Sequence, residues 1–198
     1  MVFASYWRMP LLFLISGAGT YFAFGKRTPG QYLGERFKRL MIPLLAGIFI
    51  LVPVQVYIEK SAQYDSLLSY YPHMFEGIYP AGNFSWHHLW YLPYILTFSF
   101  LMLPVFRFFK SDRGRQILER ATDKLSMRRL YILGFVPIAI SELCLRPFWP
   151  DSFGNLIDDW AQFTTTLIIF CFGFALASSN RIWPRIERDR RCLLILGV

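Results

Sequence analysis

The sequence is short of charged residues and of cysteine, and both shortages limit what the protein is. Only 17% of its 198 residues are Asp, Glu, Lys or Arg, whereas a soluble domain usually has about 25%. A mean hydropathy of +0.35 also argues against an ordinary soluble globule, and the 19% aromatic content excludes a disordered chain. The three cysteines (Cys144, Cys171 and Cys192) are scattered, which fits neither a disulfide framework nor a metal site.

The signatures of soluble enzymes are absent as well. The sequence contains no Walker loop, no G-x-S-x-G and no dinucleotide-binding fingerprint. No small-residue cleavage site follows the first apolar run, so the N-terminus does not read as a secretory signal peptide.

Long apolar runs are what the sequence has instead. A helix that crosses a bilayer needs about 20 mainly apolar residues. Five windows approach this length, and the run 193–198 begins a sixth; the five are 9–25, 40–58, 89–106, 130–147 and 160–180. Because lipid leaves only helices or closed barrels, and these runs lack the alternation of barrel strands, we predict an all-α polytopic transmembrane helix bundle. It has about five spans and the start of a sixth.

The basic residues cluster in every second connection between the predicted spans. The net charge is +8, and 18 of the 21 basic residues lie in the segments 26–39, 107–129 and 181–191. The other connections carry mainly acidic residues, as the positive-inside rule predicts for the outer side of a membrane. The charge therefore indicates topology with cytoplasmic basic loops, and we predict no nucleic-acid partner.

This topology starts the chain on the outer side, so we expect a further span before residue 1 and more helices after residue 198. The connection 111–125 forms either a short surface helix or, as we favour, a solvated connector. A helix there would place Ile117, Leu118, Ala121 and Leu125 on one side.

Two arginines stand where the second predicted span meets the cytoplasm. Arg36 and Arg39 form an R-x-x-R, and their spacing puts both on one helix face. Guanidinium groups bind phosphate bidentately, so the pair suits a cytosolic phosphate-bearing ligand such as a nucleotide or coenzyme A. The alternative, favoured on spacing alone, is a topological anchor that also contacts lipid headgroups.

Two adjacent histidines stand at the outer end of the third predicted span. His87 and His88 are flanked by Trp86 and Trp90. A histidine at this boundary is a candidate general base for a hydroxyl acceptor, and only one of the two neighbours faces any given site. The tryptophans alternatively belong to the interfacial aromatic belt. No third ligand is near, so we predict no metal site.

Span four contains a third candidate pair. Glu142 and Arg146 are four residues apart and can pair on one helix face. Ionisable residues within spans are functional candidates, Glu142 here as a catalytic carboxylate, but a structural ion pair between helices is equally compatible. The small residues 16–20 in span one favour close helix packing.

Three of these segments, taken in order, resemble the acyltransferase 3 family of bacterial integral membrane O-acyltransferases. They are the run R-M-P-L-L-F-L-I-S-G at 8–17, the R-x-x-R before residue 40, and H-L-W-Y-L at 88–92. Within the family, the chain is similar to the glucan biosynthesis protein C branch.

The resemblance implies transfer of an acetyl, succinyl or similar group from cytosolic acyl-CoA to a carbohydrate hydroxyl outside a bacterial inner membrane. It matches Arg36 and Arg39 to the family's functional R-x-x-R, which we assign to acyl-CoA, and His88 to the histidine of the family motif, our candidate for catalysis. From the aromatic content of the outer loop, we expect His87, Trp86 and Trp90 on the acceptor side, with membrane lipids as surroundings and no bound cofactor. The family's first span, which carries its best catalytic histidine, has no counterpart here. The rival classes are a transporter or flippase with a Glu142–Arg146 relay, and a non-catalytic membrane scaffold.

Overall fold

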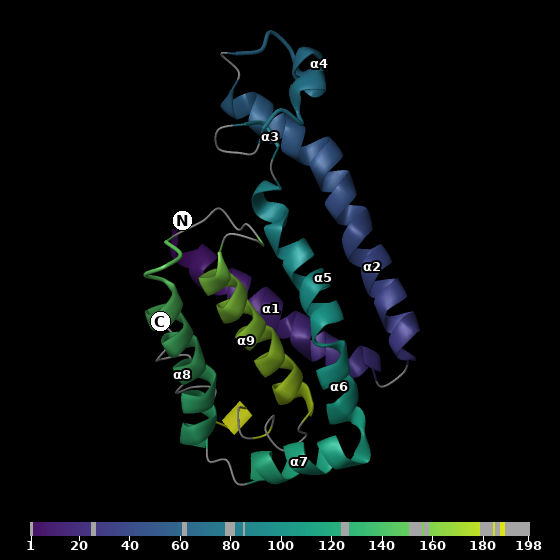
Figure 1. Cartoon of the computed structure of the whole chain (residues 1–198), viewed down its shortest axis with the longest axis vertical. Helices are drawn as coiled ribbons and strands as arrows, with labels where there is room; N and C mark the ends of the chain where they lie inside the picture. Colours follow the sequence, from purple (N-terminus) through teal and green to yellow (C-terminus); the bar gives the residue numbers. More distant parts are fainter. Residues whose placement is uncertain are drawn as a thin grey trace. The chain divides into compact units, whose positions relative to one another are not determined.

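The computed structural model describes residues 2–24, 27–60, 63–77, 82–84, 86–123, 127–150, 156, 159–178, 184, 187 and 188. Every secondary-structure element among these residues is a helix, which confirms the all-α prediction (Figure 1). The chain divides into two compact units. One comprises Gly34–Leu96, and the other comprises Met1–Leu33 together with Thr97–Val198.

Fewer helices qualify as membrane spans than the sequence predicts. The first is a continuous helix of 31 residues, Pro29–Glu59, and the second is α9 (Trp160–Ser178). α5 (Tyr91–Leu101) and α6 (Leu103–Lys110) make a third only if they are counted as one span, because they are bent by 54°. Among the described residues, helices make up most of each of the five predicted windows, but the predicted count of about five spans is not confirmed for this part of the chain.

The sequence explains two of the shortfalls. In α8 (Met127–Leu145) the arginines at 128 and 129 occupy the first turn, and the apolar helix that remains is Ile132–Leu145. This is shorter than the roughly 17 residues that a span requires. Between α5 and α6, Pro104 has no N–H to offer to the carbonyl of Phe100, so the α-helical pattern is interrupted there.

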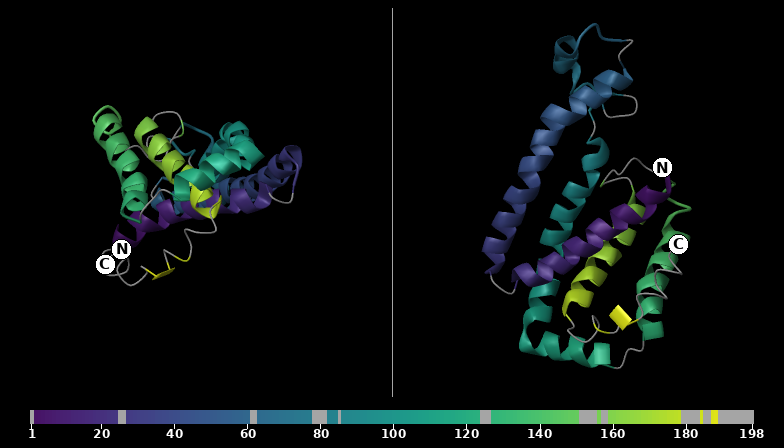
Figure 2. Two further views of the ribbon diagram at one scale, coloured as in Figure 1. Left: turned by 90° about the horizontal axis from the view of Figure 1, so that it is seen from below. Right: turned by 180° about the vertical axis from the view of Figure 1, so that it is seen from behind.

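The larger unit is held together by close contact between α1 (Val2–Phe24) and α9, which lie side by side in Figures 1 and 2, with α8 next to α9. A Cβ atom on Gly17 would lie 1.9 Å from the carbonyl oxygen of Phe170, and one on Gly173 would lie 2.0 Å from that of Leu14. Two glycines therefore let the two backbones touch, as the small residues of span one predict.

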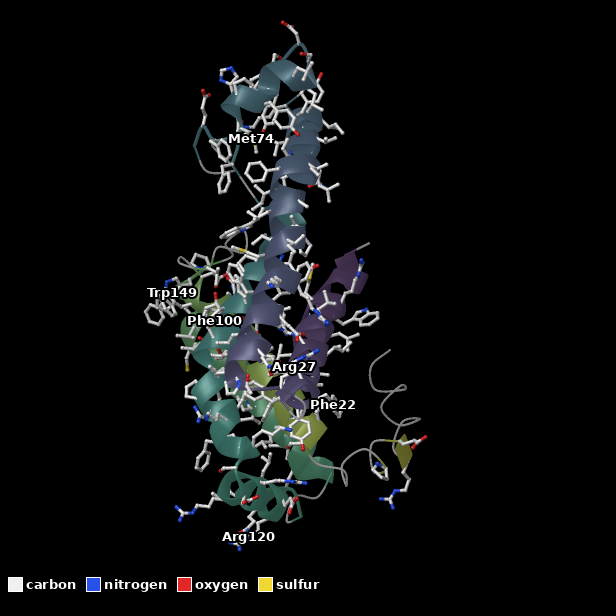
Figure 3. The ribbon with its side chains drawn as sticks, turned by 90° about the vertical axis from the view of Figure 1, so that its right-hand side faces the viewer. Phe22, Arg27, Met74, Phe100, Arg120 and Trp149 are labelled. Atoms are coloured by element: carbon white, nitrogen blue, oxygen red, sulfur yellow. The ribbon has the colours of Figure 1, made fainter. Side chains whose placement is uncertain are left out.

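Aromatic rings fill the space beside this contact. The rings of Phe106 and Phe174 stack with their centroids 4.0 Å apart, and Phe98 packs against Phe13 and Phe170. Other apolar side chains point away from the core: Phe22, which projects outward from α1 in Figure 3, is 61% exposed. Such a surface suits contact with lipid.

The connection after α6 is helical rather than irregular. α7 runs from Asp112 to Asp123, so the helix alternative for 111–125 holds where the structure describes it. Ile117 on this helix is 52% exposed. α7 therefore lies on the surface of its unit.

The smaller unit contains most of a long helix, a cap that packs against it, and residues 86–96. α2 (Pro29–Ala46), η1 (Gly47–Leu51) and α3 (Val52–Glu59) form the helix. We call residues 63–77 and 82–84 the cap; it contains α4 (Leu67–Tyr70) and η2 (Tyr71–His73), and Figure 1 shows α4 beside α3. Met74, labelled in Figure 3, packs with Tyr70 against Val52 and Val56.

Candidate functional site

The arginine pair lies at the polar end of the long helix. Arg36 and Arg39 are on α2, just before the apolar run that begins at Leu40. Nη2 of Arg39 is 3.8 Å from a carboxylate oxygen of Glu35, and the two side chains are 74% and 43% exposed. An ion pair this open to solvent is weak, so Glu35 leaves the guanidinium accessible to a stronger anion.

The long helix changes its hydrogen-bond register eight residues beyond Arg39. Gly47–Leu51 is a π-helix, and the N–H of Val52 donates to the carbonyl of Gly47, five residues back. Segments of π-helix are rare and occur often at functional sites. Arg39 and Gly47 are separated by about 12 Å along the helix axis, since an α-helix rises 1.5 Å per residue.

The histidine motif packs onto this π-helix. His87–Trp90 forms the short 3₁₀ helix η3, which leads directly into α5. A Cβ atom on Gly47 would lie only 2.2 Å from Cδ1 of Leu89, so the leucine of the motif occupies the space that the glycine leaves open. The motif is thereby held beside the middle of the predicted span 40–58, whereas the sequence alone suggests a position at the outer membrane boundary.

The two tryptophans of the motif stand at the ends of η3, with Trp86 just before its first residue and Trp90 as its last. The rings of Trp90 and Tyr94 pack edge to face with their centroids 5.3 Å apart, and Tyr94 is fully buried. The backbone of His87 and His88 is part of η3, but their side chains lie outside the described residues.

A buried asparagine, Asn83, holds the two segments of the cap together. The side-chain amide of Asn83 donates to the hydroxyl of Tyr64 and to the carbonyl of His73, both at 2.9 Å. Its Oδ1 accepts a hydrogen bond of 2.8 Å from Nζ of Lys60, which also donates to the carbonyl of Gly82. With only 5% of its surface exposed, Asn83 is a structural residue of the cap, although Asn-Phe-Ser matches a glycosylation sequon.

The cap also buries a tyrosine. Tyr70 is fully buried, and its hydroxyl donates to the carbonyl of Asn83. Burial raises the pKa of the Tyr70 phenol above its usual value of 10.0, and neighbouring Tyr64 adds to the increase. This phenol therefore stays protonated well into the alkaline range.

Glu142 belongs to the larger unit, where it forms part of a polar network. Nε and Nη2 of Arg146 donate to its two carboxylate oxygens at 2.8 and 3.1 Å, and Thr165 of α9 donates to Oε1 at 2.7 Å. Arg146 also lies 3.5 Å from the carboxylate of Asp159, which is 2% exposed and accepts from the N–H of Gln162 at the start of α9. The carboxylate of Glu142 is thus engaged in joining α8 to α9, which favours the structural alternative.

The structure brings most of the predicted site residues into one unit. Those in Gly34–Leu96 are Arg36, Arg39, Trp86, His87, His88 and Trp90. Sequence reasoning missed Gly47, which contacts the motif, and the hydrogen bond by which Tyr71 joins the cap to the helix. Pro53 is the signal in the sequence for a contact at this point, because a proline inside a span leaves a carbonyl one turn earlier without its helical hydrogen bond. Among the described residues, no three His, Cys, Asp or Glu side chains are placed to hold a metal ion.

Comparison with known proteins bears directly on the family. The family model described as an acyltransferase domain matches residues 1–198, which is the full sequence. No curated protein and no solved structure matches the chain. The match, together with the apolar helices of the structure, makes this a membrane acyltransferase, and the chain belongs to the acyltransferase 3 family.

Proposed function

We propose that the protein takes an acyl group from cytosolic acyl-CoA and transfers it to a carbohydrate hydroxyl on the extracytoplasmic side of a bacterial inner membrane. The family match supports acyl transfer. The clustering of basic residues in alternate connections supports the sidedness. An acetyl or succinyl donor and a glucan acceptor are the specific substrates that we propose.

The observation that carries this proposal is the contact between Leu89 and Gly47. It places the histidine motif about 12 Å along the axis from Arg39 on the same helix. Coenzyme A has its phosphates at one end and its thioester at the end of a long flexible arm. A donor held by its phosphates at one end of the helix would therefore present its thioester deeper in the bundle.

In this scheme Arg36 and Arg39 bind the donor phosphates through charge-assisted hydrogen bonds. His88 acts as general base and accepts the proton of the acceptor hydroxyl. The hydroxyl oxygen attacks the thioester carbonyl, the C–O bond forms, and the C–S bond breaks with coenzyme A leaving as the thiol. Trp86, Trp90 and His87 line the acceptor side, where aromatic faces suit stacking on sugar rings.

The test is steady-state kinetics on the full-length protein in lipid vesicles, with labelled acyl-CoA and candidate glycans. Arg36→Ala and Arg39→Ala should each raise the KM for acyl-CoA roughly 10- to 100-fold, the value of a charge-assisted hydrogen bond, and leave kcat less affected. Lys38→Ala is the matched control, because Lys38 is an exposed basic residue of the same turn. Solute transport without any acylated product would refute the proposal in favour of a transporter.

A further inference from the structure

The π-helix in the middle of the long helix has a cause in the sequence. Pro53 lacks an N–H, so the carbonyl of Phe49, four residues earlier, loses its α-helical donor. In a span this loss is serious, because lipid offers no water to replace the missing hydrogen bond. The residues around this carbonyl are themselves outward-facing, with Phe49 48% and Ile50 62% exposed.

The cap supplies the missing donor. The hydroxyl of Tyr71 donates to the carbonyl of Phe49 at 2.7 Å. The rings of Phe75 and Phe49 pack edge to face with their centroids 6.2 Å apart, so a second residue of the cap contacts the same part of the helix. Phe49 lies ten residues before Glu59, or about 15 Å back along the helix. The cap is therefore folded back beside the helix and fixed at the π-helix.

Besides the cap, the histidine motif also contacts the π-helix. Gly47 is buried, and any side chain on it would collide with Leu89, two residues from His87 and adjacent to His88. Leu89 also packs against the cluster of Val52, Val56, Tyr70 and Met74 that joins cap and helix. The π-helix thus contacts the cap through the Phe49 carbonyl and the motif through Gly47.

We propose that the π-helical segment Gly47–Leu51 positions the histidine motif for acyl transfer, with Gly47 and Tyr71 as positioning residues. The inference rests on the proposed function for its catalytic consequence. Gly47 sets how closely the motif approaches the helix that carries Arg36 and Arg39. Tyr71 holds the cap against the same turn, and the cap core in turn packs on Leu89.

The first test concerns the structure alone and needs no activity. Tyr71→Phe removes only the hydroxyl and should lower the folding equilibrium constant of the purified full-length protein roughly 5- to 100-fold, as expected for an unsatisfied carbonyl. Pro53→Ala returns an N–H to the helix, so in that background the same change should have an effect below about 2-fold. Tyr57→Phe is the control, since the described part of the chain offers its hydroxyl no hydrogen bond. An equal effect of Tyr71→Phe in both backgrounds would overturn the assignment of Tyr71.

The second test concerns the position of the motif. Gly47→Ala should lower kcat by about tenfold or more, because small displacements of catalytic groups have large effects. The KM for acyl-CoA should stay within about twofold, since the arginine pair lies about 12 Å away along the axis. Gly30→Ala is the matched control on α2, where an added Cβ meets nothing within 4 Å.

Rescue separates positioning from a general loss of structure. Leu89→Ala removes the atoms with which a methyl group added at Gly47 would collide, so Gly47→Ala should impair kcat less in the Leu89→Ala background than in the natural one. Additive losses, or a KM that rises as much as kcat falls, would overturn the positioning role. If the natural protein transfers no acyl group while the Tyr71 and Pro53 changes remain coupled in stability, the proposed function fails and the structural role of the π-helix stands.

Discussion

Adding one methyl group to α1 tests the backbone contact that organises the larger unit. Gly17→Ala would place its Cβ 1.9 Å from the carbonyl oxygen of Phe170, 2.9 Å from the carbonyl carbon and 3.1 Å from the nitrogen of Phe174. An ordinary carbon–oxygen contact is about 3.3–3.6 Å, so α1 and α9 must separate by roughly 1.5 Å. Both obstructing groups are backbone atoms of a helix, which cannot rotate away.

The expected loss of stability follows from two opposing effects. Overpacking of this kind costs about 1–3 kcal/mol, and the separation also weakens the dispersion contacts along the helix pair, so a total of about 3–4 kcal/mol is reasonable. Alanine recovers about 1 kcal/mol because it favours the helix more than glycine does. The net loss of about 2–3 kcal/mol corresponds to a fall in Tm of roughly 4–12 °C for a chain of this size.

Thermal unfolding of the purified protein in detergent measures this directly, with Gly19→Ala as the matched control. Gly19 lies two residues along the same helix, and a Cβ there meets nothing within 4 Å, so its Tm should stay the same or rise slightly. Gly173→Ala should resemble Gly17→Ala, and the double variant should lose less than the sum, because one separation of the helices relieves both collisions. Equal Tm values for Gly17→Ala and Gly19→Ala would refute the contact.

Three further predictions concern charge and titration. Glu35→Gln removes the carboxylate beside Arg39, so the KM for acyl-CoA should fall by up to about threefold, consistent with a weak exposed ion pair; an unchanged or higher KM contradicts the phosphate-binding role. Glu142→Gln should lower Tm while the folded protein keeps its kcat, because the carboxylate joins α8 to α9; a large loss of kcat at unchanged Tm would instead make Glu142 catalytic. Since the pKa of Tyr70 is raised in the folded state, the unfolded chain binds fewer protons above about pH 10, and stability must fall as the pH rises. Tyr70→Phe should flatten the fall in Tm above about pH 10, and an unchanged slope excludes this tyrosine as its source.

Hydropathy and charge predicted the helical class but not which helices are long enough to span. Where the structure describes them, the windows of apolar residues are mainly helical, because such runs must satisfy their backbone hydrogen bonds internally. Their lengths depend on local interruptions that hydropathy averages out, such as Pro104 between α5 and α6. A bend of 54° turns one predicted window into two helices.

Two basic residues outside the three clusters also have positions that the sequence pattern does not predict. Lys60 stands among acidic residues of a connection predicted to be external, and the structure gives it two hydrogen bonds inside the cap. Arg146 is held by Glu142 and Asp159. These two residues, which break the topological pattern, are thus paired within the protein, and their pairing depends on tertiary contacts that spacing along the chain does not reveal.

At the candidate site, spacing along the sequence predicts the chemistry of the residues better than it predicts their position along the long helix. The R-x-x-R and H-L-W-Y motifs are visible in the sequence, but a linear reading places them at opposite ends of neighbouring spans. The cap instead lies back along the helix, because Pro53 leaves the Phe49 carbonyl in need of a donor and Tyr71 provides it. This arrangement brings Leu89 to Gly47, and so reduces the separation of the two motifs along the axis from a full span to about 12 Å. On the proposed function, a donor bound from one side and an acceptor from the other would meet within the bundle rather than at either surface.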